Sequence, residues 1–452
     1  MPSPRGWERS VLGALPGTER TWPRSIAITG GLAAVWVIEA ALAARVAAAE
    51  AVQWIATRQH VLCLFADTNY YWALARSIRL GSPYEIMLWS DIPHFALRTP
   101  GYPLFLAACW TFCGENAFAP RLIQALLGAW SVWLVMVLTR RVLTTSETAT
   151  DSREAGLNPG VVALTAGAFA ALEPYQVANA AFLLSEALFV PLMTAMLASM
   201  AAAWPSRGDS ASTGRMWPAV CVGIFAGLAV LSRPSWSPAV PLLLGVWVVC
   251  SRPGQMGGAL RAAATAAVAA AVVMTPWWVL NARVSGRFVP TAIWAGASLY
   301  DGLNPRADGA SEMSFLGDAD VWPLDESAQD ALLRDRAVAF AGANPGRACR
   351  LALIKAARFW SPWPHADVVK SPWIAVVSCV ATLPIYVLLA VGLYDRRRDA
   401  RALVLCAGPL LYFMLIHMVF VSSVRYRTPG MTPAFGLVAV GLSRVRKLLR
   451  GG

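Results

Sequence analysis

The chain has 452 residues and a net charge of +12; 57% of its residues are hydrophobic and only 14% are charged. Soluble globular chains are about half apolar and a quarter charged, so this composition excludes an ordinary soluble protein. The apolar residues form blocks of roughly 20 residues, the length that crosses a bilayer, and arginines gather between the blocks. The sequence predicts an all-α, polytopic membrane protein whose positive charge suits anionic lipid headgroups rather than nucleic acid.

The first apolar run covers about residues 25–49 and follows Arg5, Arg9, Arg20 and Arg24. It is longer than the hydrophobic region of a signal peptide and many more apolar runs follow it. We therefore expect an uncleaved first transmembrane helix. The arginines before it place the N-terminus in the cytoplasm, so the mixed, aromatic stretch at 50–119 becomes the first outer loop.

The later apolar runs alternate between outward and inward crossings. The predicted spans are 120–143, 160–175, 181–204, 216–231, 238–250, an Ala/Val-rich run ending at "TPWWVLNAR", 372–394, 402–421 and 431–442. Most arginine-rich short loops then fall on the cytoplasmic side, namely 144–158, 206–214 and 395–401. With the first helix, this gives about ten spans.

Residues 281–371 form the only long polar segment, and the topology places it outside. Its middle part, "ESAQDALLRDRAVAFAG", has apolar residues at helical spacing and predicts an amphipathic helix. The following "PGRACRLALIKAARFW" carries its arginines mainly on one face and predicts an interfacial helix.

Charged residues recur at or near the outer boundaries of the predicted spans. They are Asp67, Arg98, Glu186, Arg233, Arg425 and Arg427. A single interfacial acid or snorkelling arginine has an ordinary structural explanation, but charges at this depth are costly without partners. Several on one face predict an outer cavity with a carboxylate base and arginines suited to phosphate oxygens. Such a pairing describes glycosyl transfer from a polyprenyl-phosphate sugar, because arginines stabilise the phosphate that departs.

Six stretches together resemble the GT-C superfamily of membrane glycosyltransferases. They are "ADTNYYWALARSIRLGSPY", "RTPGYPLFLA", "LLSEALFVP", "LAVLSRPSWSPAVP", "TPWWVLNARVSGRFVPT" and "RYRTPGMTP". The chain is similar to bacterial members related to protein mannosyltransferases and the aminoarabinose transferase of lipid A. The resemblance implies a catalytic module at 1–280, an extracytoplasmic segment at 281–371, and C-terminal helices at 372–452 with an outer RYR segment.

The resemblance also implies roles for individual residues. Asp67 matches the catalytic aspartate of the first outer loop and Glu186 matches a second acid, where many relatives have aspartate. The candidates for the donor phosphate are Arg98, Arg233, Arg425, Tyr426 and Arg427. Asn69, Tyr70, Tyr71 and Tyr102 are candidates for substrate contact, although tyrosines at such positions are more often interfacial anchors.

No metal or cofactor site is predicted from spacing. The four histidines share no pattern, and the eight cysteines form no CxxC pair or zinc-type cluster. Some GT-C relatives use a divalent ion near the first-loop carboxylate, so Asp91 and His94 leave a divalent metal open.

Two function classes remain. The first is an inverting glycosyltransferase of the bacterial cytoplasmic membrane, with its active site on the extracytoplasmic face and Asp67 as general base. It would move sugar from a polyprenyl-phosphate donor to an acceptor protein, glycan or lipid. The second is a transporter or a lipid or oligosaccharide flippase, which should hold its charges near the bilayer midplane in broken helices. An oligosaccharide polymerase or ligase would lack the first-loop aspartate motif.

Overall fold

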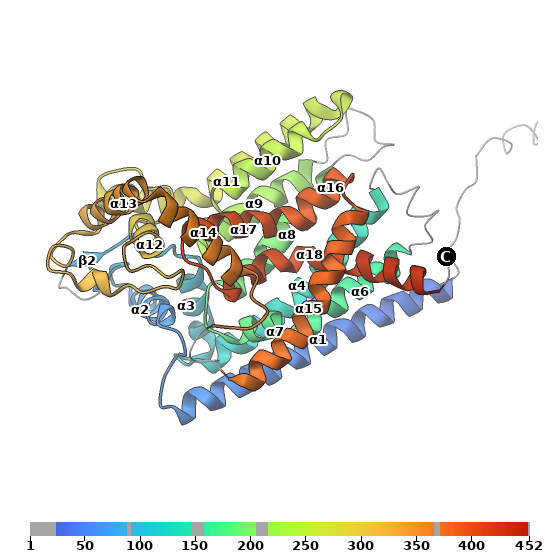
Figure 1. Ribbon diagram of the computed structural model, residues 1–452, viewed down its shortest axis with the longest axis horizontal. Helices are drawn as coiled ribbons and strands as arrows, with labels where there is room; N and C mark the ends of the chain where they lie inside the picture. Colours follow the sequence, from blue (N-terminus) through green and yellow to red (C-terminus); the bar gives the residue numbers. More distant parts are fainter. Residues whose placement is uncertain (1–23, 88–91, 146–157, 205–215, 366–370, 451–452) are drawn as a thin grey trace, which may run out of the picture.

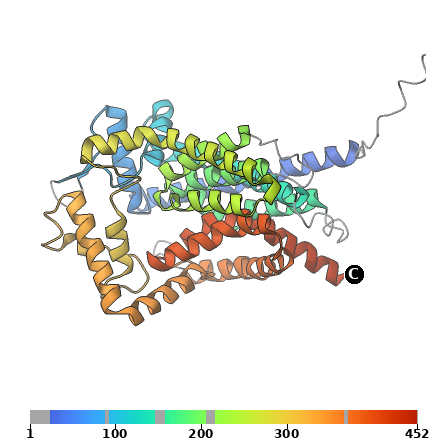
Figure 2. The ribbon, with the colours of Figure 1, turned by 90° about the horizontal axis from the view of Figure 1, so that it is seen from above.

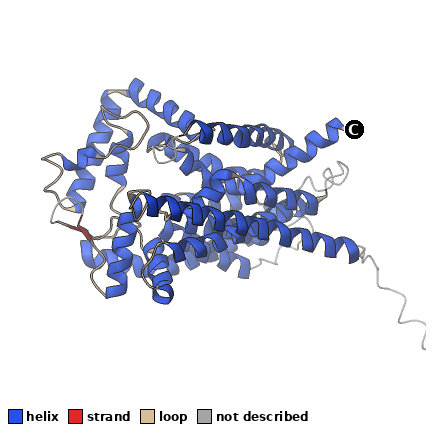
Figure 3. Cartoon of the chain, turned by 90° about the horizontal axis from the view of Figure 1, so that it is seen from below, coloured by secondary structure: helices blue, strands red, loops and turns tan. Residues whose placement is uncertain are grey.

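The computed structural model describes residues 24–87, 92–145, 158–204, 216–365 and 371–450. The predicted N-terminal arginines before Arg24, and most of the predicted loops at 144–158 and 206–214, lie outside these residues. Within them, nearly all regular structure is helical, and Figure 3 shows one short antiparallel strand pair, β1 (Ile86–Met87) with β2 (Pro93–His94). The predicted all-α architecture is confirmed.

The described residues form the following helices in chain order. They are α1 (Arg24–Arg58), α2 (Asp67–Leu80), α3 (Gly101–Cys113), α4 (Phe118–Thr145), α6 (Pro159–Leu172), α7 (Pro174–Ala181), α8 (Glu186–Ala203), α9 (Met216–Ser232), α10 (Ala239–Val249), α11 (Met256–Ser285), α12 (Ala295–Gly302), α13 (Glu326–Ala343), α14 (Pro345–Phe359), α15 (Pro372–Asp395), α16 (Ala400–Ala402), α17 (Gly408–Val419) and α18 (Val424–Leu449). Short 3-10 turns lie at Pro234–Trp236, Pro253–Gln255 and Ser314–Gly317, and a π-helical turn at Leu403–Ala407 joins α16 to α17.

Among the described residues, six helical stretches are long and apolar enough to cross a membrane, or seven if the bent pair α6 and α7 counts as one span. The shorter apolar helices α9 and α10 pack beside α11, and α18 packs against α15. Figure 1 shows these helices running side by side as one bundle. The protein is therefore a multi-pass membrane protein.

The bend between α6 and α7 is a feature that the sequence analysis did not predict. The two helices meet at 54°, with Glu173 between them and Pro174 starting the second helix. Proline favours a kink or a break in a helix, because it lacks an N–H and its ring clashes with the carbonyl of the preceding turn. The Arg45 guanidinium of α1 donates to the carbonyls of Ala170 and Ala171, which the break leaves without helical partners.

The end of α7 is held in a similar way by α4. Arg121 donates through Nε to the carbonyl of Ala181, and Gln124 donates to the carbonyls of Ala180 and Phe182. These bonds fix the short turn at 182–185, and α8 begins immediately after it. The broken helix thereby sets the position of the first residue of α8.

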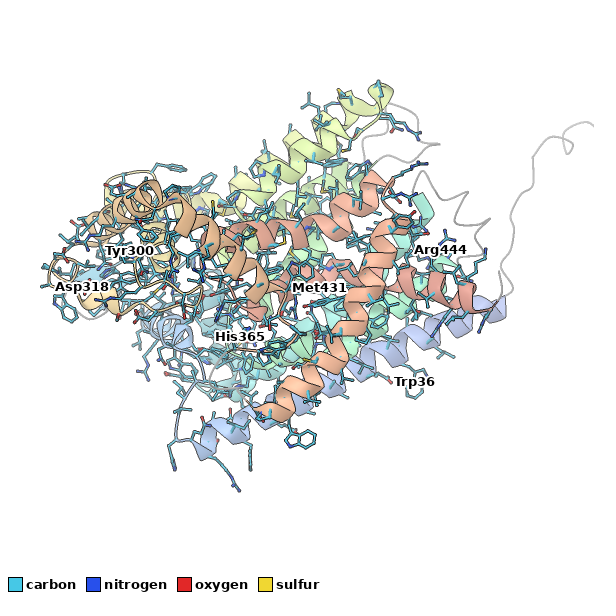
Figure 4. All side chains as sticks on the ribbon, viewed as in Figure 1. Trp36, Tyr300, Asp318, His365, Met431 and Arg444 are labelled. Atoms are coloured by element: carbon cyan, nitrogen blue, oxygen red, sulfur yellow. The ribbon has the colours of Figure 1, made fainter. Side chains whose placement is uncertain are left out.

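One end of the bundle carries a cap of short helices. Figures 1 and 2 show α2, α3, the strand pair and the segment α12 to α14 gathered at this end. Figure 4 labels Tyr300 and Asp318 there, whereas Arg444, near the C-terminus, lies at the opposite end. At that opposite end, Arg444 and Arg396 both pair with Asp395, which ties α18 to the end of α15.

Helices α15 and α18 cross with their backbones in close contact at two glycines. A Cβ atom added at Gly392 would lie 2.0 Å from the carbonyl oxygen of Leu437, and one at Gly441 would lie 2.0 Å from that of Leu388. Small residues at membrane helix interfaces allow this approach. Because the obstructing atoms are backbone, neither position can accept a side chain unless the helices separate.

We therefore expect Gly392→Val to loosen the α15–α18 contact. Forcing extra atoms into a packed helix interface costs about 1–3 kcal/mol, and the backbone contact here places the variant toward the upper end. Thermal unfolding in detergent should show a lower midpoint than the wild type. Gly245→Val is a matched control, because a Cβ atom there meets no other atom within 4 Å. An unchanged midpoint for Gly392→Val would contradict the crossing.

Candidate active site

Asp67 is the first residue of α2, in the cap of short helices at one end of the bundle. Its Oδ1 lies 3.1 Å from an amino nitrogen of Arg98 and its Oδ2 lies 3.1 Å from one of Arg425. About a third of the side chain is exposed, at 32%. Burial would raise the pKa of this carboxyl, but the guanidinium groups of Arg425 and Arg98 outweigh it and hold the pKa below its usual value. Asp67 is therefore ionised at neutral pH.

Glu186 is the first residue of α8 and its side chain is fully buried. Its Oε1 lies 2.8 Å from Arg233 and 2.5 Å from Arg425. Arg425 thus contacts both acids, through Nε to Glu186 and through an amino nitrogen to Asp67. A buried carboxylate is strongly unfavourable without such partners, so Glu186 and its two arginines have to be considered as one unit.

Distant parts of the chain bring these five charges together. Arg98 lies in the loop before α3, Arg233 directly follows α9, and Arg425 lies in the first turn of α18. The structure therefore joins five of the residues predicted from the sequence into a single cluster of two carboxylates and three guanidinium groups.

Tyr426 lies beside this cluster, and its ring stacks on that of His417. Its ring lies 4.1 Å from that of His417 at an interplanar angle of 1°. The guanidinium carbons of Arg233 and Arg425 lie 5.2 and 5.4 Å from the centre of the Tyr426 ring. The aromatic face therefore supports both arginines by cation–π contact.

Arg98 lies between two aromatic rings, those of Tyr70 and Trp294, at 5.4 and 5.2 Å. Its backbone carbonyl accepts a bond from the Tyr84 hydroxyl. The Nε–H of Arg98 is buried and has no acceptor among the described residues. An unpaired buried donor is costly, so this atom is available for an oxygen of a bound molecule.

The remaining candidates take different positions. Tyr71 and Tyr102 are buried and pack edge to face beneath the site, with their hydroxyls bonded to Ser185 and Gln124. Asn69 is exposed on α2. Arg427 points away from the cluster: it is buried between the rings of Tyr175 and Tyr386 and donates to the carbonyls of Phe359 and Ser361 at the end of α14.

No metal site is formed by the part of the chain that the structure describes. No group of three or more His, Cys, Asp or Glu side chains there is arranged to hold an ion. Asp91 lies outside the described residues. His94 is buried, and its ring nitrogens lie near the carbonyl of Ile92 and the side chain of Gln329.

Several residues around the cluster were not identified from the sequence. They are Tyr84, Trp294, Glu326 and His417. Trp294, Glu326 and His417 belong to segments far from Asp67 along the chain and to none of the six quoted stretches, so spacing gives no signal for them. Tyr84 ends the stretch that contains Asp67, and that position is the signal that could have identified it.

Comparison with known proteins supports the fold. The sequence matches no protein-family model and no curated protein. The structure is similar to the oligosaccharyltransferase of Archaeoglobus fulgidus in its apo form, with a TM-score of 0.53 and 13% identity over 92% of this chain. The same enzyme in complex with Zn and sulfate gives a TM-score of 0.51. ArnT from Cupriavidus metallidurans, bound to undecaprenyl phosphate, matches 95% of this chain and 79% of its own at 16% identity, with a TM-score of 0.43.

The chain spans about half the length of the archaeal enzyme, since the match covers 52% of it. At this identity the likeness establishes only that the chain shares the fold of this enzyme.

Proposed function

We propose that the protein is a glycosyltransferase that moves a sugar from a polyprenyl-phosphate donor to an acceptor on the extracytoplasmic side of the membrane. The observation that carries the proposal is the placement of Asp67 between Arg98 and Arg425. A carboxylate beside two phosphate-binding groups, at one end of a membrane bundle, suits a reaction between a lipid-linked phosphate and an acceptor hydroxyl. The archaeal oligosaccharyltransferase, one of the solved structures with this fold, is itself a transferase.

In this proposal Asp67 is the general base. It takes the proton of the acceptor hydroxyl as that oxygen attacks the anomeric carbon of the sugar. The bond from this carbon to the phosphate oxygen breaks, and the electron pair leaves with the polyprenyl phosphate. Attack from the side opposite the phosphate inverts the configuration. Arg98 and Arg425 stabilise the negative charge that develops on the phosphate.

The shared arginines would link donor binding to the basicity of Asp67. Before binding, both guanidinium groups lower the pKa of this carboxyl. When a phosphate takes part of their hydrogen bonding, Asp67 loses stabilisation of its charged form and becomes a stronger base. The donor itself would thus prepare the base for the acceptor.

Glu186 plays a different part in this proposal. It is fully buried, and Arg233 and Arg425 occupy the same oxygen, Oε1. A carboxylate so enclosed would position the two arginines rather than take a proton from an acceptor. The nearby Tyr426 ring would complete their alignment.

A transporter or flippase is the competing function. It would need charges along a path across the bilayer. The five clustered charges instead lie beside the outer cap, next to α2 and the loop before α3. The bent pair α6 and α7 is the single broken span found among the described residues, and its break is capped by Arg45. The enzyme therefore accounts for the arrangement better.

The orientation in the cytoplasmic membrane is also part of the proposal. The short basic stretches "DRRRDAR" at 395–401 and "RVRKLLR" at 444–450 lie at the end that holds Arg396 and Arg444, which favours that end as cytoplasmic. The cap with Asp67 and the segment 281–371 would then face outward. The proposed steps involve only side chains of the chain itself.

Two native cysteines test this orientation. Cys349 in α14 and Cys250 after α10 are both exposed. A membrane-impermeant maleimide added to intact spheroplasts should label Cys349, and it should label Cys250 only after the membrane is permeabilised. Mass spectrometry of the peptides identifies the labelled residue. The reverse order would place the cap in the cytoplasm and remove the basis for an outer active site.

The function itself is tested in cells. Envelope lipids, glycans and proteins are compared by mass spectrometry between cells with the wild-type chain, cells without it, and cells with Asp67→Asn. We expect one sugar modification to be present in the first and absent from the other two. A modification profile that is identical in all three would oppose the proposal.

A further inference from the structure

The segment 281–371 is hydrogen-bonded to the loop that carries Arg98. Glu326, the first residue of α13, accepts hydrogen bonds from the backbone N–H groups of Phe95 and Ala96, at 3.0 Å each to its nearer oxygen. The carbonyl of Ala96 accepts in turn from the backbone N–H of Ile293, at 2.8 Å. Residues 95 and 96 are thus hydrogen-bonded to a segment about 200–230 positions later in the chain.

The same segment also reaches the side chain of Arg98. Trp294, next to Ile293, stacks on the guanidinium group at 5.2 Å. Trp294 packs with Leu97 in a small apolar cluster that includes Ile86 and Leu74 of the first outer loop. The backbone two and three residues before Arg98 is therefore held by residue 293 and the start of α13, and the Arg98 side chain contacts Trp294.

We propose that Glu326 is a positioning residue for Arg98, holding the loop before α3 so that this arginine faces Asp67 and the donor phosphate. The inference rests on the donor-phosphate role proposed above for Arg98. It gives the segment 281–371 a direct function in the active site, in addition to any role in admitting the acceptor.

The burial of Glu326 supports this reading. The side chain sits at the helix start, with its residue 8% exposed. Desolvation raises the pKa of the carboxyl to about 7, although the N–H groups of Ala96 and Phe95 and the charge of Arg287 lower it. Asp330, on the next turn of α13, raises it further. A buried acid at this position is costly, so its contact with the loop has to provide the compensation.

Because Oε2 alone accepts from both N–H groups, at 3.0 Å from Phe95 and 3.1 Å from Ala96, one acceptor oxygen should suffice to hold the loop. Glu326→Gln keeps the length and one carbonyl oxygen, and it should preserve most of the function. Glu326→Ala removes both acceptors and leaves two buried N–H groups unpaired. The pair of variants separates the hydrogen bonds from the mere presence of a side chain.

The first readout does not depend on transfer. Hydrogen exchange of the amides at residues 95–98 should be about tenfold faster or more in Glu326→Ala, and close to wild type in Glu326→Gln. Asp335→Ala is the matched control, because Asp335 is an exposed carboxylate of the same helix that pairs with Arg334 rather than with the loop. Unchanged exchange at 95–98 in Glu326→Ala would overturn the inference.

The second readout is kinetic. Misplacement of a binding group by a distant change can reduce rates up to about 100-fold, so we expect the KM for a polyprenyl-phosphate hexose to rise about tenfold in Glu326→Ala with a smaller change in kcat. In an Arg98→Ala background the same substitution should have almost no further effect, because the residue it positions is gone.

The two readouts distinguish failure of the inference from failure of the proposed function. If Glu326→Ala raised the KM equally in the presence and in the absence of Arg98, Glu326 would contribute to overall stability and not to the position of Arg98. If the wild type shows no transfer from any polyprenyl-phosphate sugar, the proposed function fails, and the exchange at 95–98 still decides whether Glu326 holds the loop.

Discussion

Replacing Asp67 by asparagine should abolish most sugar transfer while leaving the protein folded and able to bind donor. The amide keeps the size of the side chain but cannot accept the proton of the acceptor hydroxyl. A general base contributes about 10²- to 10⁴-fold, so the rate of transfer should fall by that factor. Binding of the donor phosphate should persist, because Arg98 and Arg425 remain and no longer share their hydrogen bonds with a carboxylate.

The measurement is single-turnover transfer from a polyprenyl-phosphate hexose by purified protein in vesicles. Asp318→Asn serves as the control, since Asp318 is an exposed carboxylate in the same outer cap. It should transfer at the wild-type rate. Near-normal transfer by Asp67→Asn would exclude Asp67 as the base and return attention to Glu186.

Arg425 should be the most sensitive of the three clustered arginines. It alone contacts both acids, so Arg425→Ala removes a proposed phosphate ligand and one of the two partners of the buried Glu186. A hydrogen bond to a charged group contributes about 1.5–3 kcal/mol, which corresponds to a loss of about 10- to 150-fold in donor affinity. Arg425→Lys should lie between the wild type and the alanine variant, because lysine keeps the charge and loses the fork.

The same helix provides a matched control for Arg425. Arg427 is also buried and charged, but it donates to carbonyls at the end of α14 rather than to the cluster. Arg427→Ala should lower the unfolding midpoint in detergent and leave donor affinity per folded molecule unchanged. Equal losses of donor affinity in both variants would mean that the two arginines do not differ in the way that the structure indicates.

Much of the fold was predictable because a bilayer restricts the chain so strongly. Apolar blocks of spanning length specify helices, and the arginines between them predict the direction of each span. The same restriction made Asp67, Glu186 and Arg233 identifiable in the sequence, because a charged residue beside an apolar run is unusual. The bend at Glu173 and Pro174 was less evident, since a proline near the end of an apolar run also suits a simple helix end.

The different roles of Arg425 and Arg427 could not be predicted from the sequence. Both were predicted as ligands of the same phosphate, in an outer segment before the last span. The structure begins α18 at Val424, so both lie on one helix. Residues two apart on a helix point about 200° apart, so the two side chains face opposite sides. Knowing the helix boundary would have separated them.

The contacts of Glu326 were beyond prediction for a different reason. It meets residues 230 positions earlier, and its motif is an ordinary helix start after Asp325, whose side chain caps α13. Nothing in the local sequence distinguishes a first-turn glutamate that is exposed to water from one that accepts hydrogen bonds from a neighbouring loop. Only the packing of the outer cap decides between them.

We propose that one cluster binds a lipid-linked phosphate through its arginines and activates an acceptor through Asp67. The most direct test measures binding of undecaprenyl phosphate and transfer of sugar on the same preparations of wild type, Asp67→Asn and Arg425→Ala. We predict that Asp67→Asn binds but does not transfer, and that Arg425→Ala loses binding and transfer together. Transfer by Asp67→Asn at the wild-type rate, or full binding and transfer by Arg425→Ala, would contradict the account.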